Sequence, residues 1–375
     1  MACSGSCGSV PDIETLLGQD DSAVLKKRLQ GTVDEVSLSK STTIPAEWYR
    51  DDLIYQLERK AIFTQEWLYA AHVNEFPEQG CYIAFTIAGY PVIVQRTQSD
   101  TFVAFHNFCR HRGGPLQYEG RGQSKTNVFR CKYHGWVYSM DGALMHTPML
   151  SGVEEFDKAA MSLRPLACQL YRGLIFVHFN NHTCPPLEEW LSPDLRKLLE
   201  PYPIERYSVH SDLHHTFKAN WKNYVDNYSE GYHIPLVHPR LNDTVSVKQY
   251  QVINNEAGRF SEHVAPSKMG EVCPGVWVFQ YPNLMLNVYG DGMNIERVEP
   301  GETPGECVLR YTYMFLTAEK TEANEAAVEF SKEVTMEDIK ICEAVQKNLN
   351  AGVYTTGRLN PSMENGTWFF HQLVR

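Results

Sequence analysis

The chain has 375 residues, 43% of them hydrophobic and 21% charged, and a formal net charge of -11. This length is sufficient for two domains with separate cores, and no segment approaches the roughly 18 to 20 uninterrupted apolar residues of a membrane span. The acidic balance argues against a nucleic-acid partner, because a phosphate-binding surface needs clustered Lys and Arg.

Residues 1–44 are expected to form a polar arm with one amphipathic stretch at 13–29. The arm lacks the charged start and apolar run of a secretory signal, so we expect a cytoplasmic protein. A helix is predicted to begin near Pro45, whose missing amide is tolerated in a first helical turn. Apolar residues then follow at four-residue steps on one face: Tyr49, Leu53 and Leu57.

Beyond this helix the sequence changes to β-branched and aromatic residues separated by Gly, Asp and Asn, which predicts strands. The segments are CYIAFTIAGYPVIVQR, TFVAFHNF, NVFRCKYHGWVYS and GLIFVHF. We expect an all-β domain that, together with its leading helix, covers residues 45–180.

Two loops projecting from the predicted sheet carry a Cys-x-His and a Cys-x-x-His motif, formed by Cys109 and His111 and by Cys131 and His134. Two thiolates and two imidazoles at this spacing can hold a Rieske [2Fe-2S] centre, which transfers single electrons. A Cys2His2 zinc site is the alternative, but zinc-finger spacings usually place a Cys pair before a His pair. The motifs therefore favour the Rieske centre.

Residues 181–375 are predicted to form an α+β domain, because strand runs are followed by long helices. Strands are expected in YSVHSDLHHTFKAN, VWVFQYPNLMLNVYG and CVLRYTYMFLTAE, and a final helix at about 323–349. The arrangement indicates a curved antiparallel sheet wrapped around a helix.

A second candidate metal site lies in NWKNYVDNYSEGYHIPLVHPR, where His233 and His238 are five residues apart and Glu230 precedes the first by three. We expect the helix to end near His233, because Pro235 disfavours helical geometry at Ile234, and the chain then to turn His238 inward. Two histidines and one carboxylate form the facial triad of non-heme iron(II) oxygenases. A His-x4-His pair alone is weak evidence, but beside a Rieske motif it predicts a terminal oxygenase.

On these motifs the chain resembles the α subunits of Rieske non-heme iron oxygenases over roughly residues 45–375. The resemblance implies a helix-grip, START-like catalytic domain after the Rieske domain. It also implies that the carboxylate ligand is Asp338, in the late segment MEDIKICEAVQKNLNAGVYTTGR, with Glu337 as the alternative.

The same resemblance implies a role for Glu230 as an electron bridge between subunits. It would connect the cluster ligand His134 of one subunit to the iron ligand His233 of its neighbour, since the two metal sites of one chain are too far apart. A head-to-tail ring follows, and the resemblance implies a homotrimer. An ordinary surface ion pair is the alternative role of Glu230.

Substrate candidates come from segments that resemble quaternary-ammonium Rieske oxygenases, the group acting on choline, carnitine and glycine betaine: YPNLMLNVYGDGMNIERVEP, EDIKICEAVQKNL and GTWFFHQLV. Trp277, Phe279 and Tyr281 alternate on one predicted strand and so point to one face, with Tyr289 further along. Aromatic faces attract quaternary ammonium by about 0.5 to 2 kcal/mol each. An aromatic stripe of this kind is, however, usually plain core.

The sequence thus predicts an oxygenase that uses O2, a [2Fe-2S] cluster and mononuclear Fe(II) to hydroxylate a C–H bond next to nitrogen in a small cationic substrate. Choline, converted to betaine aldehyde, is the first choice. The alternatives are N-demethylation of a betaine or oxygenation of carnitine, aromatic-ring dihydroxylation, and a non-catalytic Rieske electron carrier. Because no Gly-rich dinucleotide fingerprint follows a strand, NAD(P)H would act only through a separate reductase or ferredoxin.

Overall fold

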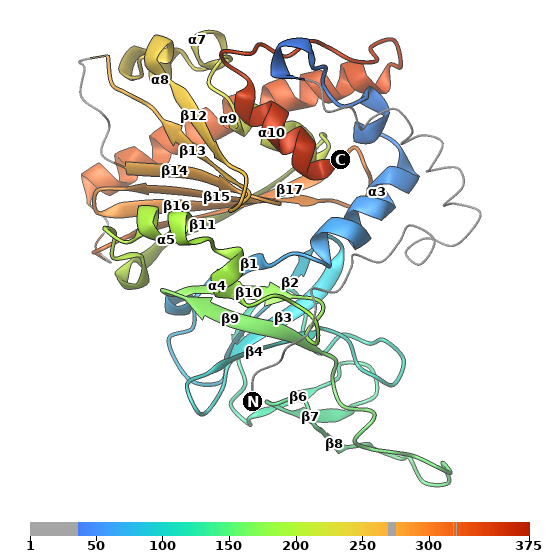
Figure 1. Cartoon of the computed structure of the whole chain (residues 1–375). Helices are drawn as coiled ribbons and strands as arrows, with labels where there is room; N and C mark the ends of the chain where they lie inside the picture. Colours follow the sequence, from blue (N-terminus) through green and yellow to red (C-terminus); the bar gives the residue numbers. More distant parts are fainter. Residues whose placement is uncertain (1–36, 269–274, 318, 320) are drawn as a thin grey trace. The chain divides into compact units, whose positions relative to one another are not determined.

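The computed structural model describes residues 37–268, 275–317, 319 and 321–375, so the predicted amphipathic stretch at 13–29 lies outside the described residues. The described chain divides into two compact units (Figure 1). The first unit is Phe63–Leu187, and the second combines 37–62 with Glu188–Arg375. The segment from Pro45 therefore groups with the second unit, whereas we expected it to lead the β domain.

The first unit is built on an antiparallel sheet of seven strands in the order β1-β10-β9-β4-β3-β2-β5. A second, three-stranded sheet, β6-β7-β8, is formed by the chain between β5 and β9. The strands expected from the β-branched segments all form. Their bounds are β1 Leu68–His72, β2 Cys81–Ile87, β3 Tyr90–Arg96, β4 Phe102–His106, β5 Gly120–Gln123, β6 Val128–Arg130, β7 Val137–Ser139, β8 Leu144–His146, β9 Pro165–Tyr171 and β10 Leu174–His178.

The second unit contains another antiparallel sheet of seven strands, in the order β11-β17-β16-β15-β14-β13-β12. Its strands are β11 Ser208–Phe217, β12 Gln251–Asn255, β13 Phe260–Val264, β14 Gly275–Gln280, β15 Leu284–Tyr289, β16 Gly292–Pro300 and β17 Cys307–Phe315. All of its strands except the first are joined in chain order, which is typical of a meander, and β11 closes the far edge against β17.

Helices cover one face of this second sheet, with α9 and α10 on the same side (Figure 1). The main helices are α3 Asp52–Glu58, α5 Pro193–Leu199, α6 Trp221–Tyr228, α7 Ile234–Val237, α8 Pro239–Thr244, α9 Glu322–Asn350 and α10 Asn365–Val374. The last long helix was predicted at about 323–349 and is confirmed. It begins where the Thr321 side chain accepts a hydrogen bond from the Asn324 amide, a usual N-cap arrangement.

A buried ion pair attaches the leading segment to α6 and explains why that segment belongs to the second unit. Lys222 Nζ lies 2.6 Å from Glu58 Oε1, and both side chains are almost fully buried. Trp221 Nε1 donates to the other oxygen of Glu58 at 2.9 Å. A buried charge pair of this kind is costly to break, because removing one partner leaves the other without compensation.

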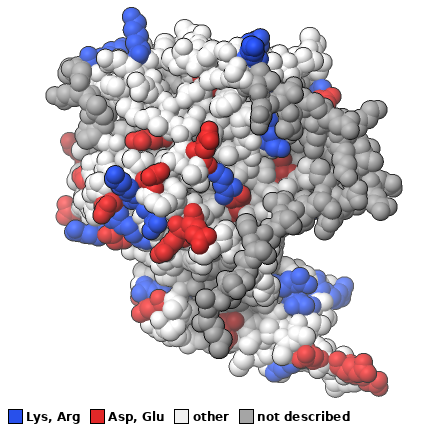
Figure 2. All heavy atoms as spheres, in the orientation of Figure 1, with Lys and Arg blue, Asp and Glu red and all other residues white. Residues whose placement is uncertain are grey.

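Two observations bear on partners. Among the described residues, no helix is long and apolar enough to cross a membrane. On the face drawn in Figure 2, described Lys and Arg side chains lie among Asp and Glu side chains.

Candidate metal centres and substrate pocket

The two histidines of the predicted iron site lie on a loop and between two short helices rather than at the end of one long helix. Helix α6 ends at Tyr228, five residues before His233, so the expectation that it reaches His233 is wrong. Pro235 lies in the first turn of α7, where a missing amide needs no acceptor. The backbone at His238 is non-helical (φ -119, ψ 76) and separates α7 from α8.

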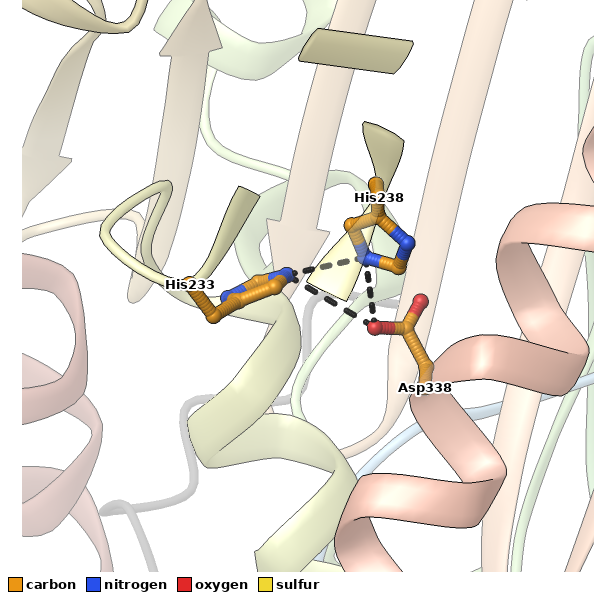
Figure 3. Close-up of side chains that lie close together, drawn as sticks. All are labelled: His233, His238 and Asp338. Carbon is orange, nitrogen blue, oxygen red and sulfur yellow. Dashed lines mark hydrogen bonds and ion pairs between the residues drawn. The ribbon is translucent and has the colours of Figure 1, made fainter. Parts of the chain in front are cut away.

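His233, His238 and Asp338 converge on one point (Figure 3). The Nε2 atoms of the two histidines are 3.1 Å apart. Asp338 Oδ1, from the middle of α9, lies 2.9 Å from His238 Nε2 and 3.6 Å from His233 Nε2. All three ligand atoms fall within 4.8 Å of one another, and two imidazoles with one carboxylate suit iron(II) with open positions.

Two further carboxylates contact the Nδ1 atoms of the histidines, on the side of each ring away from the candidate metal position. His233 Nδ1 lies 2.6 Å from Glu230 Oε1, and His238 Nδ1 lies 2.7 Å from Glu337 Oε2. An Nδ1–H that donates to a carboxylate leaves the Nε2 lone pair free for a metal and fixes the ring orientation. Glu337, the alternative ligand, therefore contacts the opposite nitrogen from the one that Asp338 faces.

The pKa of His238 is set by its burial and by the two carboxylates that it contacts. Burial lowers the pKa of His238, but the carboxylates of Asp338 and Glu337 raise it by more, so its pKa lies above the ordinary value. Asn227 Nδ2 donates to Asp338 Oδ1 at 2.6 Å and further orients the carboxylate. The two carboxylates raise the pKa of His238 because their negative charge favours the protonated imidazole.

The Cys/His loops of the first unit repeat one turn geometry. The Cys109 amide donates to Gly114 O at 2.7 Å, and the Cys131 amide donates to Trp136 O at 2.8 Å. Each loop contains a glycine with positive φ, 69° at Gly113 and 73° at Gly135, a conformation that favours glycine. The two predicted motifs are thus presented by matching turns.

Inside these loops the thiols and imidazoles separate by burial. Cys109 and Cys131 are buried, whereas His111 and His134 are exposed with ring centroids 4.7 Å apart. A Cβ added at Gly114 would come within 3.2 Å of Cys131 Sγ, so the absence of a side chain there leaves room beside the thiol. Two buried sulfurs and two paired, exposed imidazoles fit a [2Fe-2S] cluster ligated on one side by each type.

A cavity of about 430 Å³ adjoins the His233–His238–Asp338 triad in the second unit. Of the four aromatic residues predicted to bind substrate, Trp277 and Tyr289 line it. Phe279 instead packs against Phe370 of α10 with centroids 5.6 Å apart, and Tyr281 lies under Arg259 at 5.5 Å. The alternation of β14 placed Phe279 on the correct face, but α10 covers that part of the sheet.

Sequence reasoning missed the polar inner wall of this cavity. Glu296 on β16 is buried and accepts hydrogen bonds at 2.9 Å from the side chains of Asn287, Asn294 and Tyr224. His263 on β13 also lines the cavity, and Tyr250 is its 2.6 Å partner at Nδ1. The available signal was the alternation itself, which puts Asn287, Asn294 and Glu296 on the inward face of strands that are otherwise apolar there.

Comparison with known proteins agrees with both centres. The Rieske [2Fe-2S] domain family matches residues 66–157, and the ring hydroxylating alpha subunit (catalytic domain) family matches residues 204–272 and 254–375. Choline monooxygenase of Arabidopsis thaliana is 28% identical over 358 residues, covering 91% of this chain and 84% of that protein. The carnitine monooxygenase oxygenase subunit of Acinetobacter pittii is 30% identical over 358 residues, covering 88% and 94%.

Among solved structures, a quaternary ammonium Rieske monooxygenase in complex with L-carnitine has a TM-score of 0.80 at 26% identity, covering 91% of this chain and 99% of that one. A naphthalene 1,2-dioxygenase with TM-score 0.69 and 20% identity shares the fold. The chain belongs to the Rieske non-heme iron oxygenases, with an N-terminal Rieske domain and a C-terminal catalytic domain of mixed α+β structure. Within that family it is a monooxygenase that uses a Rieske [2Fe-2S] cluster and a mononuclear iron.

Proposed function

We propose that this enzyme hydroxylates a quaternary ammonium compound, with choline as the preferred substrate and betaine aldehyde as the product. The supporting observation is a single cavity lined by the aromatic rings of Trp277 and Tyr289 and by the triad His233, His238 and Asp338. Aromatic faces attract an ammonium group, and the triad would hold iron beside it. The relatives named for choline, carnitine and glycine betaine act on the same class of compound.

The reaction balances as a monooxygenation. One atom of O2 is inserted into a substrate C–H bond as hydroxyl and the other leaves as water, with two electrons supplied by the reductase and two protons by solvent. For choline the oxidised carbon is the carbinol carbon, one bond further from nitrogen than the sequence prediction stated. The product is betaine aldehyde hydrate, which loses water to give the aldehyde.

The bound cofactors would supply single-electron transfer and O2 activation, and the chain's residues would position them. We propose Cys109, His111, Cys131 and His134 as cluster ligands, and His233, His238 and Asp338 as iron ligands. Glu230, hydrogen-bonded to His233, would receive a partner subunit's cluster histidine in a homotrimer. Inter-subunit electron transfer is described for the quaternary ammonium Rieske monooxygenase structure that this chain resembles.

A substrate panel tests the proposal. Purified enzyme, a Rieske-compatible reductase and NAD(P)H are mixed with choline, glycine betaine, carnitine and naphthalene, and substrate-dependent oxygen consumption and product mass are measured. We expect choline to support oxygen consumption with betaine aldehyde formed in proportion, and His233→Ala to abolish both. If naphthalene alone stimulated oxygen consumption, the result would refute the proposal and favour ring dihydroxylation.

A second candidate is oxidation of carnitine or N-demethylation of a betaine, which is favoured by the 30% identity to a carnitine monooxygenase oxygenase subunit. Demethylation would release formaldehyde, which choline oxidation does not. The cytoplasmic location expected from the N-terminal residues stays a prediction, and three plant relatives are described as chloroplastic.

A further inference from the structure

Among the described residues of the second unit, Glu296 differs from the other buried glutamates because the donors to its carboxylate are neutral. Glu58 is paired with Lys222, and Glu299 with Arg297. Glu296 Oε1 accepts from two asparagine side chains and Oε2 from one tyrosine, each at 2.9 Å. None of these contacts supplies positive charge.

The cavity around Glu296 is mostly apolar, and apart from its histidines the ionisable acids and bases in its described lining are all carboxylic acids or tyrosines. No Lys or Arg occurs among the described residues that line it, whereas Glu230, Asp338 and Glu296 do. Burial lowers the pKa of His263 to about 4, so its imidazole is neutral near pH 7 and adds no cation. Iron(II) at the triad would balance the charge of Asp338, and Glu230 is hydrogen-bonded to the iron-site residue His233. In the described lining, Glu296 is therefore the carboxylate that neither the metal nor a cationic side chain would neutralise, and the space beside it suits a ligand that brings positive charge.

Energetics point the same way. Moving a carboxylate out of water without a cation costs several kcal/mol, and burial accordingly raises the pKa of Glu296 to about 7. Three donors nevertheless converge on its two oxygens and favour the ionised form. Such an arrangement is poorly suited to an empty apolar pocket, but a bound cation would offset the desolvation.

We propose that Glu296 is the specificity residue of this pocket: its carboxylate balances the ammonium charge of the substrate and selects cations that carry no carboxylate of their own. The inference rests on the proposed function and narrows it to choline-like compounds. A glycine betaine or carnitine carboxylate would meet no Lys or Arg in the described lining and would be repelled by Glu296.

A hydroxyl group on the cation also fits the pocket. His263 Nε2 is buried and has no hydrogen-bond partner within the described part of the chain. The His263 ring packs edge-on against Tyr228, whose hydroxyl donates to Asn287 Oδ1 at 2.6 Å, and Asn287 in turn donates to Glu296. A substrate hydroxyl can donate or accept and would satisfy Nε2 in either tautomer.

The test combines a change of charge in the protein with a change of charge in the ligand. Glu296→Gln keeps the side-chain shape, and its amide can still meet the tyrosine hydroxyl while its oxygen accepts from the asparagines. Dissociation constants are measured by calorimetry on the iron-loaded enzyme for choline, for its uncharged carbon isostere with a tert-butyl group in place of trimethylammonium, and for glycine betaine. KM is measured with reductase in parallel.

In the wild type we expect choline to bind at least about 10-fold more tightly than either other compound. In Glu296→Gln choline should weaken by about 10- to 100-fold while the uncharged isostere changes little, since charge interactions in a low-dielectric site are strong. Glu262→Gln is the matched control, because Glu262 on β13 precedes the cavity residue His263 and so faces the other side of the sheet. It should leave choline binding unchanged.

An equal loss of affinity for choline and for the uncharged isostere would overturn the inference, and so would a wild type that prefers glycine betaine. Loss of mononuclear iron from Glu296→Gln with unaltered ligand preference would assign the carboxylate to metal charge balance instead. If Glu296→Gln does not fold, Glu296→Asp should keep the preference for the charged ligand, and loss of that preference would refute the inference. Failure of every ammonium compound to support turnover would refute the proposed function. The comparison of dissociation constants would still test the role of Glu296, because it does not depend on turnover.

Discussion

Substitution of Asp338 and of its neighbour Glu337 on α9 is expected to change iron binding to different degrees, because their carboxylates contact opposite nitrogens of the His238 imidazole. Asp338 Oδ1 lies 2.9 Å from His238 Nε2, on the side where the metal would lie. Glu337 Oε2 lies 2.7 Å from His238 Nδ1. We predict that Asp338→Ala loses mononuclear iron and turnover, whereas Glu337→Gln keeps the iron with reduced affinity.

The magnitude for Glu337→Gln follows from the bond that changes. Gln retains an oxygen that accepts from Nδ1–H, but the charge-assisted bond becomes neutral, a loss of about 1 kcal/mol. The Glu337 side chain is 32% exposed, so solvent screens part of this difference. We expect a loss of about 3- to 10-fold in iron affinity, below the roughly 10- to 100-fold loss typical of mutated partners of metal-bound histidines, because Gln keeps an acceptor oxygen.

The assay is iron content per chain after dialysis against a graded series of chelator concentrations, with the visible spectrum of the cluster as an internal control. Both variants should keep the cluster spectrum, because the cluster motifs lie elsewhere in the sequence. Complete loss of mononuclear iron in Glu337→Gln together with full retention in Asp338→Ala would exchange the two roles and refute the assignment.

The remaining predictions concern the cluster, the bridge and stability. The purified enzyme should be red-brown with about three irons per chain, and Cys131→Ser should bleach it; a colourless, zinc-loaded wild type would contradict the Rieske assignment. Glu230→Gln should bind both metals and substrate but reoxidise its reduced cluster slowly in stopped-flow absorbance, and mixing it with His111→Ala chains should restore some activity if electrons cross between subunits. Lys222→Met should cost about 3 to 5 kcal/mol and lower the thermal midpoint by about 10 °C, with partial recovery in the double variant with Glu58→Gln; equal midpoints would show that the buried pair contributes nothing.

The two Cys/His motifs can be recognised from the sequence because the residues of each motif lie close together in the chain. Cys109 with His111, and Cys131 with His134, each lie within one turn, so short-range geometry alone brings each pair together. Asp338 is 100 residues from His238 in the chain, and only the family resemblance pointed to it. The structure brings it to the triad through the packing of α9 over the sheet.

The substrate wall was harder to predict, because strand alternation defines a face but not what covers it. Trp277 and Phe279 share a face of β14, and only the first reaches the cavity, since α10 packs on the second. Glu296 was overlooked because a Glu in a strand usually faces solvent, and its burial depends on three partners from β15, β16 and α6. Strand alternation indicates that Asn287, Asn294 and Glu296 share a face, but it does not show that they bond to one another or that the face is buried.

Helix α9 carries both Asp338, the proposed iron ligand, and residues that line the cavity, so side chains along α9 would limit the length of the substrate. Val334 and Ala327 line the cavity at 4 and 11 residues before Asp338, which at the rise of an α-helix is about 6 Å and about 16 Å along one rigid axis. A bulkier side chain at Ala327 would shorten the longest substrate that the cavity accepts, without altering the chemistry near the metal. Chain-length preference could therefore evolve one helical turn at a time, independently of the charge preference set on the sheet.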